Sequence, residues 1–248
     1  MQKNIILAFD FDGVIIDSAY ESYFISAKTY NEMTGKNAIN DKNAKQYSRG
    51  RAFSLNAETN YTLIKMIDEN PNLDFSTLTQ AQFDMNAIQN KELAKVFAEK
   101  FFQNRKNMAD TKEWFDMQLL FEGIIEEINE LAKIYSIYIV TTKPRHTVLA
   151  LLDYFKTNFP HKKVLTELFG ETKENLLKEV AEKENVLISQ VVLIDDALKQ
   201  LVNAKEIGAK TILAMWGEKR EVFESEAKKQ GIKIAYSPSE CKSIIKAL

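Results

Sequence analysis

The segment Ile5–Val14 begins as an apolar run and ends in two aspartates, Asp10 and Asp12, followed at once by Gly13. The run predicts a short buried strand. Residues i and i+2 of an extended chain point to the same face, so both carboxylates would project together beyond the carboxyl end of that strand. Open α/β sheets place their ligand sites at this edge. Asp and Gly are also ordinary turn residues. However, two carboxylates this close repel each other unless a cation or a shared proton relieves them, which favours a metal-assisted site.

The stretch that follows is helical in pattern. Between Ser18 and Leu120 there is almost no strand signal, and apolar residues recur at steps of three and four. We expect loops around Gly35 and Gly50, where glycine interrupts the pattern. The spacing predicts helices over Tyr20–Thr34, Glu58–Glu69, Thr79–Phe102 and Thr111–Phe115.

From Phe121 onward strand and helix patterns alternate, which predicts a parallel sheet with helices on both faces. The fold class is therefore α/β, with a Rossmann-like core formed by residues 1–17 and 121–248 and an inserted all-helical domain formed by residues 18–120. The predicted strands are Ile137–Val140, Lys163–Leu168, Val191–Ile194, Thr211–Met215 and Ile232–Ala235. The predicted helices are Ile124–Lys133, Thr147–Phe155, Lys173–Lys183, Ala197–Ile207 and Glu240–Leu248.

Charge and composition exclude several classes of function. The net charge of -2 gives no basic field for nucleic acid. One cysteine, Cys241, excludes an intrachain disulfide, and two histidines disfavour a multi-histidine metal site. No apolar stretch reaches the roughly 18 residues that span a bilayer. We therefore expect a cytoplasmic monomer or homodimer with a small-molecule substrate and neither a nucleic-acid nor a membrane partner.

Three more polar elements follow strands or begin helices. Thr141 ends an apolar strand, and a hydroxyl at that place can donate to a phosphate oxygen. Lys173 begins a helix, where it could offset negative charge. Asp195 and Asp196 end the strand Val191–Ile194. Thr and Lys are common at such places without a function, but two adjacent acids after an apolar strand are hard to explain structurally. Mg²⁺ takes carboxylate oxygens of this kind.

In this order the elements resemble the haloacid dehalogenase (HAD) superfamily with a helical cap inserted after the first strand, in the phosphoglycolate phosphatase-like or sugar phosphatase-like subgroup. The resemblance covers residues 4–18 and 121–215, and in the cap it is architectural only. The family's first motif, D-x-D-G-[TV], matches residues 10–14. The second matches Ile139–Thr141, followed by Thr142-Lys143-Pro144 as in many members. The third is a lysine at a helix start, here Lys173, with Lys143 and Lys178 as weaker rivals, and the fourth is Asp195-Asp196.

The resemblance also implies a role for each matching residue. Asp10 is expected to attack phosphorus, and Asp12 to act as general acid and then general base. Thr141, Thr142 and Lys173 are expected to bind the phosphoryl oxygens. The expected Mg²⁺ ligands are the Asp10 carboxylate, the Asp12 carbonyl oxygen, and Asp196 with Asp195.

One feature departs from the pattern of many family members. They have Gly-Asp in the fourth motif and a second aspartate four residues on. Here Asp195 replaces the glycine, and Gln200 stands at the later position. The departure leaves open whether Asp195 or Asp196 is the closer metal ligand.

Within the predicted cap, Arg49 and Arg51 are the best candidates for substrate specificity. Arginine binds planar anions with two hydrogen bonds, and Gly50 between them would let the backbone approach a ligand closely. Two surface arginines on a loop are an equally simple interpretation. The aromatic residues Phe97, Phe101, Phe102 and Trp114 are expected in the core of the cap rather than at the substrate.

We therefore expect a Mg²⁺-dependent phosphomonoester hydrolase that acts on a small phosphorylated metabolite through an aspartyl-phosphate. A phosphosugar mutase would use the same residues. A dehalogenase is disfavoured because those members usually lack the acid at position 12, and a phosphonate hydrolase would need a cap lysine that we do not identify. The alternative from another class is a non-catalytic phosphoacceptor or phosphate-binding protein.

Overall fold

The computed structural model describes residues 5–54, 56–109, 111–166, 172–217 and 221–248. They form two compact units. One contains the residues up to Asp17 together with Leu119–Leu248, and the other contains Ser18–Gln118. None of the helices in these described ranges is both long enough and apolar enough to cross a membrane.

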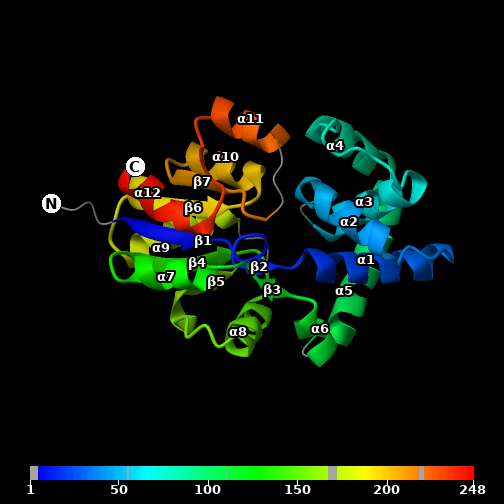
Figure 1. Cartoon of the computed structure of the whole chain (residues 1–248), viewed down its shortest axis with the longest axis horizontal. Helices are drawn as coiled ribbons and strands as arrows, with labels where there is room; N and C mark the ends of the chain where they lie inside the picture. The colour runs from blue at the N-terminus through cyan, green and yellow to red at the C-terminus, as the bar shows by residue number, and fades with distance from the viewer. Residues whose placement is uncertain (1–4, 55, 110, 167–171, 218–220) are drawn as a thin grey trace. The chain divides into compact units, whose positions relative to one another are not determined.

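The first unit is built on a six-stranded sheet in the order β5-β4-β1-β6-β7-β8, in which every neighbouring pair is parallel (Figure 1). This confirms the α/β fold class predicted from the alternating pattern. The first strand of the chain lies at the centre of the sheet, which explains its unbroken apolar run. The strands are β1 (Ile6–Phe9), β4 (Ser136–Thr141), β5 (Val164–Thr166), β6 (Val191–Asp195), β7 (Lys210–Ala214) and β8 (Lys233–Ala235).

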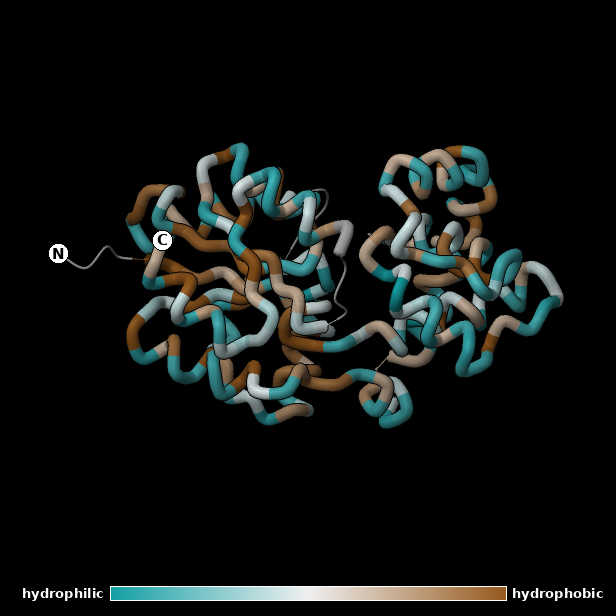
Figure 2. The backbone as a smooth tube through the Cα atoms, turned by 45° about the horizontal axis from the view of Figure 1, so that its top comes forward, coloured by the Kyte–Doolittle hydropathy of each residue, from teal (hydrophilic) through white to brown (hydrophobic). Residues whose placement is uncertain are grey.

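Helices cover the sheet on both faces (Figure 1). Ala8, Val140 and Leu193 pack on one face with apolar residues of α9 and α10. Successive strand residues point to opposite faces, and Leu7 and Ile139 are buried on the other side. Figure 2 shows the strands as mainly hydrophobic segments and the helices as mixed ones. The helices of this unit are α7 (Ile124–Ala132), α8 (Arg145–Tyr154), α9 (Lys173–Lys183), α10 (Leu198–Glu206), α11 (Glu221–Lys229) and α12 (Cys241–Lys246).

Two short strands lie where the chain leaves the first unit and where it returns. β2 (Ile16–Asp17) and β3 (Leu119–Leu120) pair in antiparallel fashion. The backbone N–H of Phe121 also donates to the carbonyl oxygen of Ile15 at 3.1 Å. The two connections between the units are therefore held side by side. The pair is too short to produce a periodic pattern, so it is not among the strands predicted from the sequence.

In the described residues of the second unit, all the regular elements are helices. Its helices α1, α3 and α5 pack against one another, and α2 packs against α1 and α3. Phe97, Phe101 and Trp114 are buried in its core as expected, whereas Phe102 is 57% exposed. The helices are α1 (Ala19–Thr34), α2 (Asp41–Gly50), α3 (Ala57–Glu69), α4 (Gln80–Gln89), α5 (Lys91–Met108) and α6 (Lys112–Asp116), with a 3₁₀ turn at Arg51–Phe53.

The single helix predicted over Thr79–Phe102 is wrong, because the chain forms α4 and α5 with a break at Asn90. Thr79 caps α4 by accepting a hydrogen bond from the backbone of Gln82 at 3.3 Å. Asn90 has φ -109° and ψ 13°, which ends α4 and precedes α5. The apolar spacing continues across Asn90, so the periodicity did not reveal the break.

The expected loop around Gly50 is also wrong, because this segment is helix α2. The residues that α2 buries have helical spacing, but only Tyr47 among them is a large apolar residue, since the others are Asn43, Gln46 and Gly50. A hydrophobic pattern therefore could not reveal the helix. A Cβ atom on Gly50 would lie 2.4 Å from Leu63 Cδ1, so this glycine serves close packing inside the helical unit.

Two further differences concern the first unit. Helix α11 was not predicted. The predicted strand Lys163–Leu168 is observed as β5, which begins at Val164. Its last two predicted residues, 167 and 168, lie outside the described residues.

Candidate active site at the carboxyl edge of the sheet

The register of three neighbouring strands brings the predicted site residues to one edge. Phe9 at the end of β1 pairs with Ile139 of β4 and with Ile194 of β6. Asp10, the next residue, therefore lies level with the ends of β4 and β6. The last residues of these two strands are Thr141 and Asp195. The backbone N–H of Asp10 donates to the carbonyl oxygen of Ile194 at 2.9 Å, which ties the start of the loop to β6.

Lys173, the first residue of α9, lies between two of these acids. Its Nζ atom is 2.6 Å from Asp195 Oδ2 and 3.0 Å from Asp10 Oδ1. The lysine side chain is 4% exposed, and those of Asp195 and Asp10 are 0% and 10% exposed. The lysine predicted from the helix start therefore contacts both acidic motifs. Lys178, a weaker candidate for the same role, lies further along the same helix.

Burial, together with the neighbouring charges, shifts the pKa values of these three residues. Burial raises the pKa of Asp10 to about 7, the positive charge of Lys173 opposes the rise, and the negative charges of Asp195 and Asp12 add to it. Burial also raises the pKa of Asp195, again against the effect of Lys173. Burial would lower the pKa of Lys173, but the charges of Asp10 and Asp195 outweigh it and raise that pKa. The pKa values of both acids are therefore raised in spite of the adjacent Lys173 ammonium.

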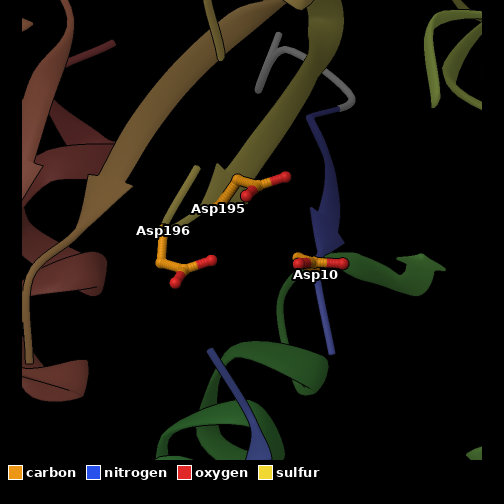
Figure 3. Close-up of side chains that lie close together, drawn as sticks. All are labelled: Asp10, Asp195 and Asp196. Atoms are coloured by element: carbon orange, nitrogen blue, oxygen red, sulfur yellow. The ribbon is translucent and has the colours of Figure 1, made fainter. Parts of the chain in front are cut away.

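Asp10, Asp195 and Asp196 form a compact acidic group, which Figure 3 shows at the ends of the two neighbouring strands β1 and β6. One carboxylate oxygen from each lies within 4.8 Å of the others. Both oxygens of Asp195 accept a hydrogen bond, Oδ2 from Lys173 Nζ at 2.6 Å and Oδ1 from the backbone N–H of Ala197 at 2.8 Å. Asp196 is half-buried and extends toward Asp10 (Figure 3).

Gly13 allows Asp196 to reach this position. Its φ is +80°, a backbone conformation that residues other than glycine rarely adopt. A Cβ atom on Gly13 would lie 2.2 Å from Asp196 Oδ2. The glycine of the first motif is thus required twice, once for the turn and once for the space that the acid of the fourth motif fills.

These residues fit a hard divalent cation. The group offers one oxygen atom from each acid within 4.8 Å of the others, and among the described residues the buried Asp10 Oδ1 faces only the Lys173 ammonium, at 3.0 Å. One or two carboxylates with additional oxygen ligands suit Mg²⁺. A soft metal is disfavoured because the group contains neither sulfur nor imidazole.

A second lysine contacts the second acid of the first motif. Lys143 Nζ lies 2.9 Å from Asp12 Oδ1 and 3.2 Å from Asp12 Oδ2. The backbone N–H of Lys143 donates to Thr141 Oγ1 at 3.2 Å, so the Thr141 hydroxyl is an acceptor in this turn and its own proton can be donated elsewhere. Thr142, between them, is exposed.

Trp216 is a residue near the site that is not among those predicted from the sequence. It follows β7, and its Nε1 donates to the carbonyl oxygen of Val14 at 3.0 Å. This bond holds the turn that begins at Gly13, where the backbone N–H of Gly13 also donates to the carbonyl oxygen of Ile16 at 2.8 Å. The only sequence signal was a tryptophan followed by glycine after a strand, and this pattern does not indicate a particular chemical role.

The two predicted specificity residues, Arg49 and Arg51, belong to the helical unit. Arg49 is exposed on the last turn of α2 and lies within electrostatic range of Asp74. Arg51 is half-buried, and its Nη1 donates to the carbonyl oxygen of Ser54 at 2.8 Å. Arg51 therefore takes part in the packing of its own unit, whereas the guanidinium of Arg49 is accessible.

Comparisons with known proteins concern the family and the fold of the chain. The model of the haloacid dehalogenase-like hydrolase family matches residues 6–208. No curated protein matches the sequence.

Several solved structures share the fold along the whole chain. A candidate phosphoglycolate phosphatase from Lactobacillus delbrueckii subsp. bulgaricus is 15% identical with a TM-score of 0.71, covering 98% of this chain and 99% of its own. A candidate phosphatase from Clostridium acetobutylicum is 18% identical with a TM-score of 0.69, covering 99% of both chains. A haloacid dehalogenase-like family hydrolase from Streptococcus pneumoniae is 18% identical with a TM-score of 0.66, covering 98% and 99%. At these identities the likeness establishes the fold alone.

Proposed function

This chain belongs to the haloacid dehalogenase-like hydrolase family, and from that premise we propose that it is a phosphatase that hydrolyses a small phosphorylated metabolite through an aspartyl-phosphate. The observation that carries the proposal is the meeting of Asp10, Lys173 and the pair Asp195-Asp196 at one edge of the sheet. A nucleophilic carboxylate, a buried cation and further acids suited to Mg²⁺ are the groups that phosphoryl transfer needs.

In the first half of the reaction, a carboxylate oxygen of Asp10 attacks phosphorus and the bond from phosphorus to the ester oxygen breaks. Asp12 gives its proton to that leaving oxygen. Lys173 and the Thr141 hydroxyl bind the phosphoryl oxygens, with Thr142 nearby in the same turn. In the second half, water attacks the phosphorus of the aspartyl-phosphate, Asp12 takes the proton from the water, and the bond from phosphorus to Asp10 breaks.

Mg²⁺ bound here would supply positive charge against the negative oxygens of the nucleophile and the phosphoryl group. We propose that the Asp10 carboxylate, the carbonyl oxygen of Asp12 and the Asp196 carboxylate hold it. Asp195 is the less suitable direct ligand because both of its oxygens already accept hydrogen bonds. The role of Asp195 is instead to hold Lys173 through its ion pair and to add negative charge next to Asp196.

We further propose that the helical unit is a cap that contacts the substrate beyond its phosphate. Such insertions can close over an active site and exclude water. Among the two arginines named above, Arg49 is the better candidate for this contact, because its side chain is exposed and Arg51 is engaged with Ser54.

The test of the function is a screen of phosphorylated metabolites for release of inorganic phosphate, with Mg²⁺ and with a chelator. We expect release from at least one class of substrate, loss of that activity on chelation and its return when Mg²⁺ is restored. A phosphosugar mutase would instead convert one phosphosugar into its isomer with little phosphate release, so both products are measured. Absence of turnover with every substrate, or turnover indifferent to the chelator, would contradict the proposal.

A binding measurement supports the screen without relying on activity. Mg²⁺ at a hundredfold excess over its Kd should raise the Tm by about 5–10 °C, and Asp196→Asn should abolish most of that shift. The cation and a proton compete for Asp10, whose pKa is about 7 in its absence. Mg²⁺ binding should therefore strengthen as the pH rises through this value and weaken as it falls. A Tm shift that is unchanged in Asp196→Asn would contradict the proposed ligands.

The cap arginines can be tested on two substrates. We expect Arg49→Ala to lower kcat/KM for the best metabolite by about ten- to hundredfold, which corresponds to about 1.5–3 kcal/mol for a hydrogen bond to a charged group. The same variant should hydrolyse p-nitrophenyl phosphate nearly as well as the wild type, because that ester lacks the part to be recognised. Arg51→Ala is compared in parallel. The control is Lys91→Ala, which replaces an exposed lysine elsewhere in the helical unit. Equal small effects of both arginine variants on both substrates would show that neither arginine determines substrate specificity.

A further inference from the structure

Lys143 is a buried lysine whose ammonium contacts, within the part of the chain that the structure describes, one acidic group of the proposed mechanism. Its side chain is 5% exposed, and its Nζ bridges both carboxylate oxygens of Asp12 at 2.9 and 3.2 Å. Asp12 itself is 25% exposed. The two partners come from different segments, the loop after β1 and the turn after β4.

The turn that carries Lys143 is fixed at both ends. Thr141, at the end of β4, accepts the backbone N–H of Lys143 at 3.2 Å, and Pro144 precedes helix α8. Pro144 also restricts the backbone of Lys143 itself. The ammonium therefore reaches Asp12 from a well-defined backbone position rather than from a flexible surface arm.

The two lysines of the site have separate partners. Lys173 contacts Asp10 and Asp195, whereas Lys143 contacts Asp12. Burying a lysine with an acid contributes little net stability, because desolvation offsets much of the attraction. A second buried lysine in contact with the proposed acid/base is therefore poorly explained by stability and well explained by a role in proton transfer.

We propose that Lys143 is a positioning residue for Asp12, a role that rests on the phosphatase function proposed above. Contact with both oxygens fixes the rotation of the Asp12 carboxylate. In the first half of the reaction, the bond from phosphorus to the leaving oxygen breaks and the Asp12 proton moves to that oxygen. Asp12 is then a carboxylate, and the adjacent ammonium of Lys143 stabilises it until it takes a proton from water.

This role predicts a dependence on the leaving group. A very weakly basic leaving group, such as 2,4-dinitrophenolate, departs without a proton, so its release does not need Asp12. Phenolate and simple alkoxides are more basic and do need the proton. The quantity to compare is kcat/KM, because it reports the steps up to formation of the aspartyl-phosphate and is independent of its later hydrolysis.

The experiment measures kcat/KM of the Mg²⁺-loaded full chain on 2,4-dinitrophenyl phosphate, p-nitrophenyl phosphate and phenyl phosphate. Lys143→Met, which keeps most of the side-chain length but removes the charge, should lower kcat/KM on phenyl phosphate by about ten- to hundredfold. On 2,4-dinitrophenyl phosphate the loss should be less than about threefold. Lys143→Arg should recover most of the activity on phenyl phosphate. Asp12→Asn should show the same pattern as Lys143→Met with a larger effect.

Lys163→Met is the matched control. Lys163 is also a partly buried lysine paired with an acid, Glu184 at 3.8 Å, but it lies beside the start of β4 rather than its end. Its variant should leave the whole substrate series unchanged. Thermal unfolding is measured for every variant, and Lys143→Gln replaces Lys143→Met if the latter does not fold.

An equal loss on all three esters in Lys143→Met would overturn the positioning role, because it would show that Lys143 binds the phosphate or maintains the fold. Failure of Lys143→Arg to recover activity on phenyl phosphate would do the same. If the wild-type protein hydrolyses none of the three esters or the metabolites, the phosphatase proposal fails and the role of Lys143 falls with it. The two failures are therefore distinguished by the wild-type activity.

Discussion

Replacement of Asp10 by asparagine is expected to lower kcat by at least about a thousandfold, because an amide cannot form the aspartyl-phosphate and effects of this size follow the loss of a nucleophile. Asparagine has nearly the same shape as aspartate, so the buried strand end should be preserved. The measurement is phosphate release from the best substrate of the screen, with the wild-type protein assayed at the same Mg²⁺ concentration.

The stability of the same variant provides an independent check. In the absence of Mg²⁺, Asp10 is a buried acid whose pKa is raised to about 7, so its charged form destabilises the folded state. We therefore expect Asp10→Asn without Mg²⁺ to unfold at the same temperature as the wild type or at a higher one. Asp153→Asn, at an exposed acid paired with His161, is the control and should change neither property. Turnover near the wild-type rate in Asp10→Asn would show that Asp10 is not the nucleophile.

Replacement of Lys173 by methionine is expected to have the largest effect on stability. The change leaves Asp10 and Asp195 buried without the cation that now lies 3.0 and 2.6 Å from them. Breaking a buried ion pair on one side costs about 3–5 kcal/mol in the free energy of unfolding. Urea unfolding of the Mg²⁺-free proteins measures it. Lys163→Met should cost less than about 1 kcal/mol, because its ion pair is partly exposed.

The loss in Lys173→Met should depend on pH in a defined direction. Removal of the lysine raises the pKa of both acids further in the folded state, while in the unfolded chain it stays near the ordinary value of 3.8. The folded protein then binds more protons than the unfolded chain, so its stability falls as the pH rises above that value. The destabilisation should be small in acid and complete above the folded-state pKa, which is already about 7 for Asp10 in the wild type.

A second substitution distinguishes charge from shape in this result. Asp195→Asn combined with Lys173→Met removes one of the two unpaired acids, so the double variant should be more stable than Lys173→Met alone above about pH 7. If the double variant is no more stable than the single one, the loss arises from packing around Lys173 rather than from charge.

The sequence predicted those parts of the molecule in which a local pattern and its structural cause coincide. β1, β4 and β6 are buried on both faces and read as apolar runs, so their positions and parallel pairing could be inferred. Because parallel strands end at one edge, the meeting of Asp10 with Asp195 and Asp196 could be expected as well.

What the sequence did not reveal either lacks a hydrophobic signal along the chain or depends on contacts between distant residues. Helix α2 buries mostly polar residues, so its periodicity is invisible to a hydrophobic pattern. The break at Asn90 follows from backbone dihedrals within an uninterrupted apolar spacing. The separate partners of Lys143 and Lys173 follow from where the turn after β4 and the first residue of α9 lie in space, and no spacing along the chain distinguishes these roles. The role of Gly13 as the space for Asp196 likewise requires the fold itself.

The central place of β1 in the sheet has a consequence for biosynthesis. β1 pairs with β4 and β6, and both strands are translated only after the complete helical unit. Domains generally fold as units while they emerge from the ribosome, and pairings between distant segments form slowly. The helical unit can therefore complete its own contacts while the apolar strand before it still lacks both neighbours and stays accessible to chaperones. The aspartate proposed to attack the substrate leaves the ribosome long before the strands that hold it in place.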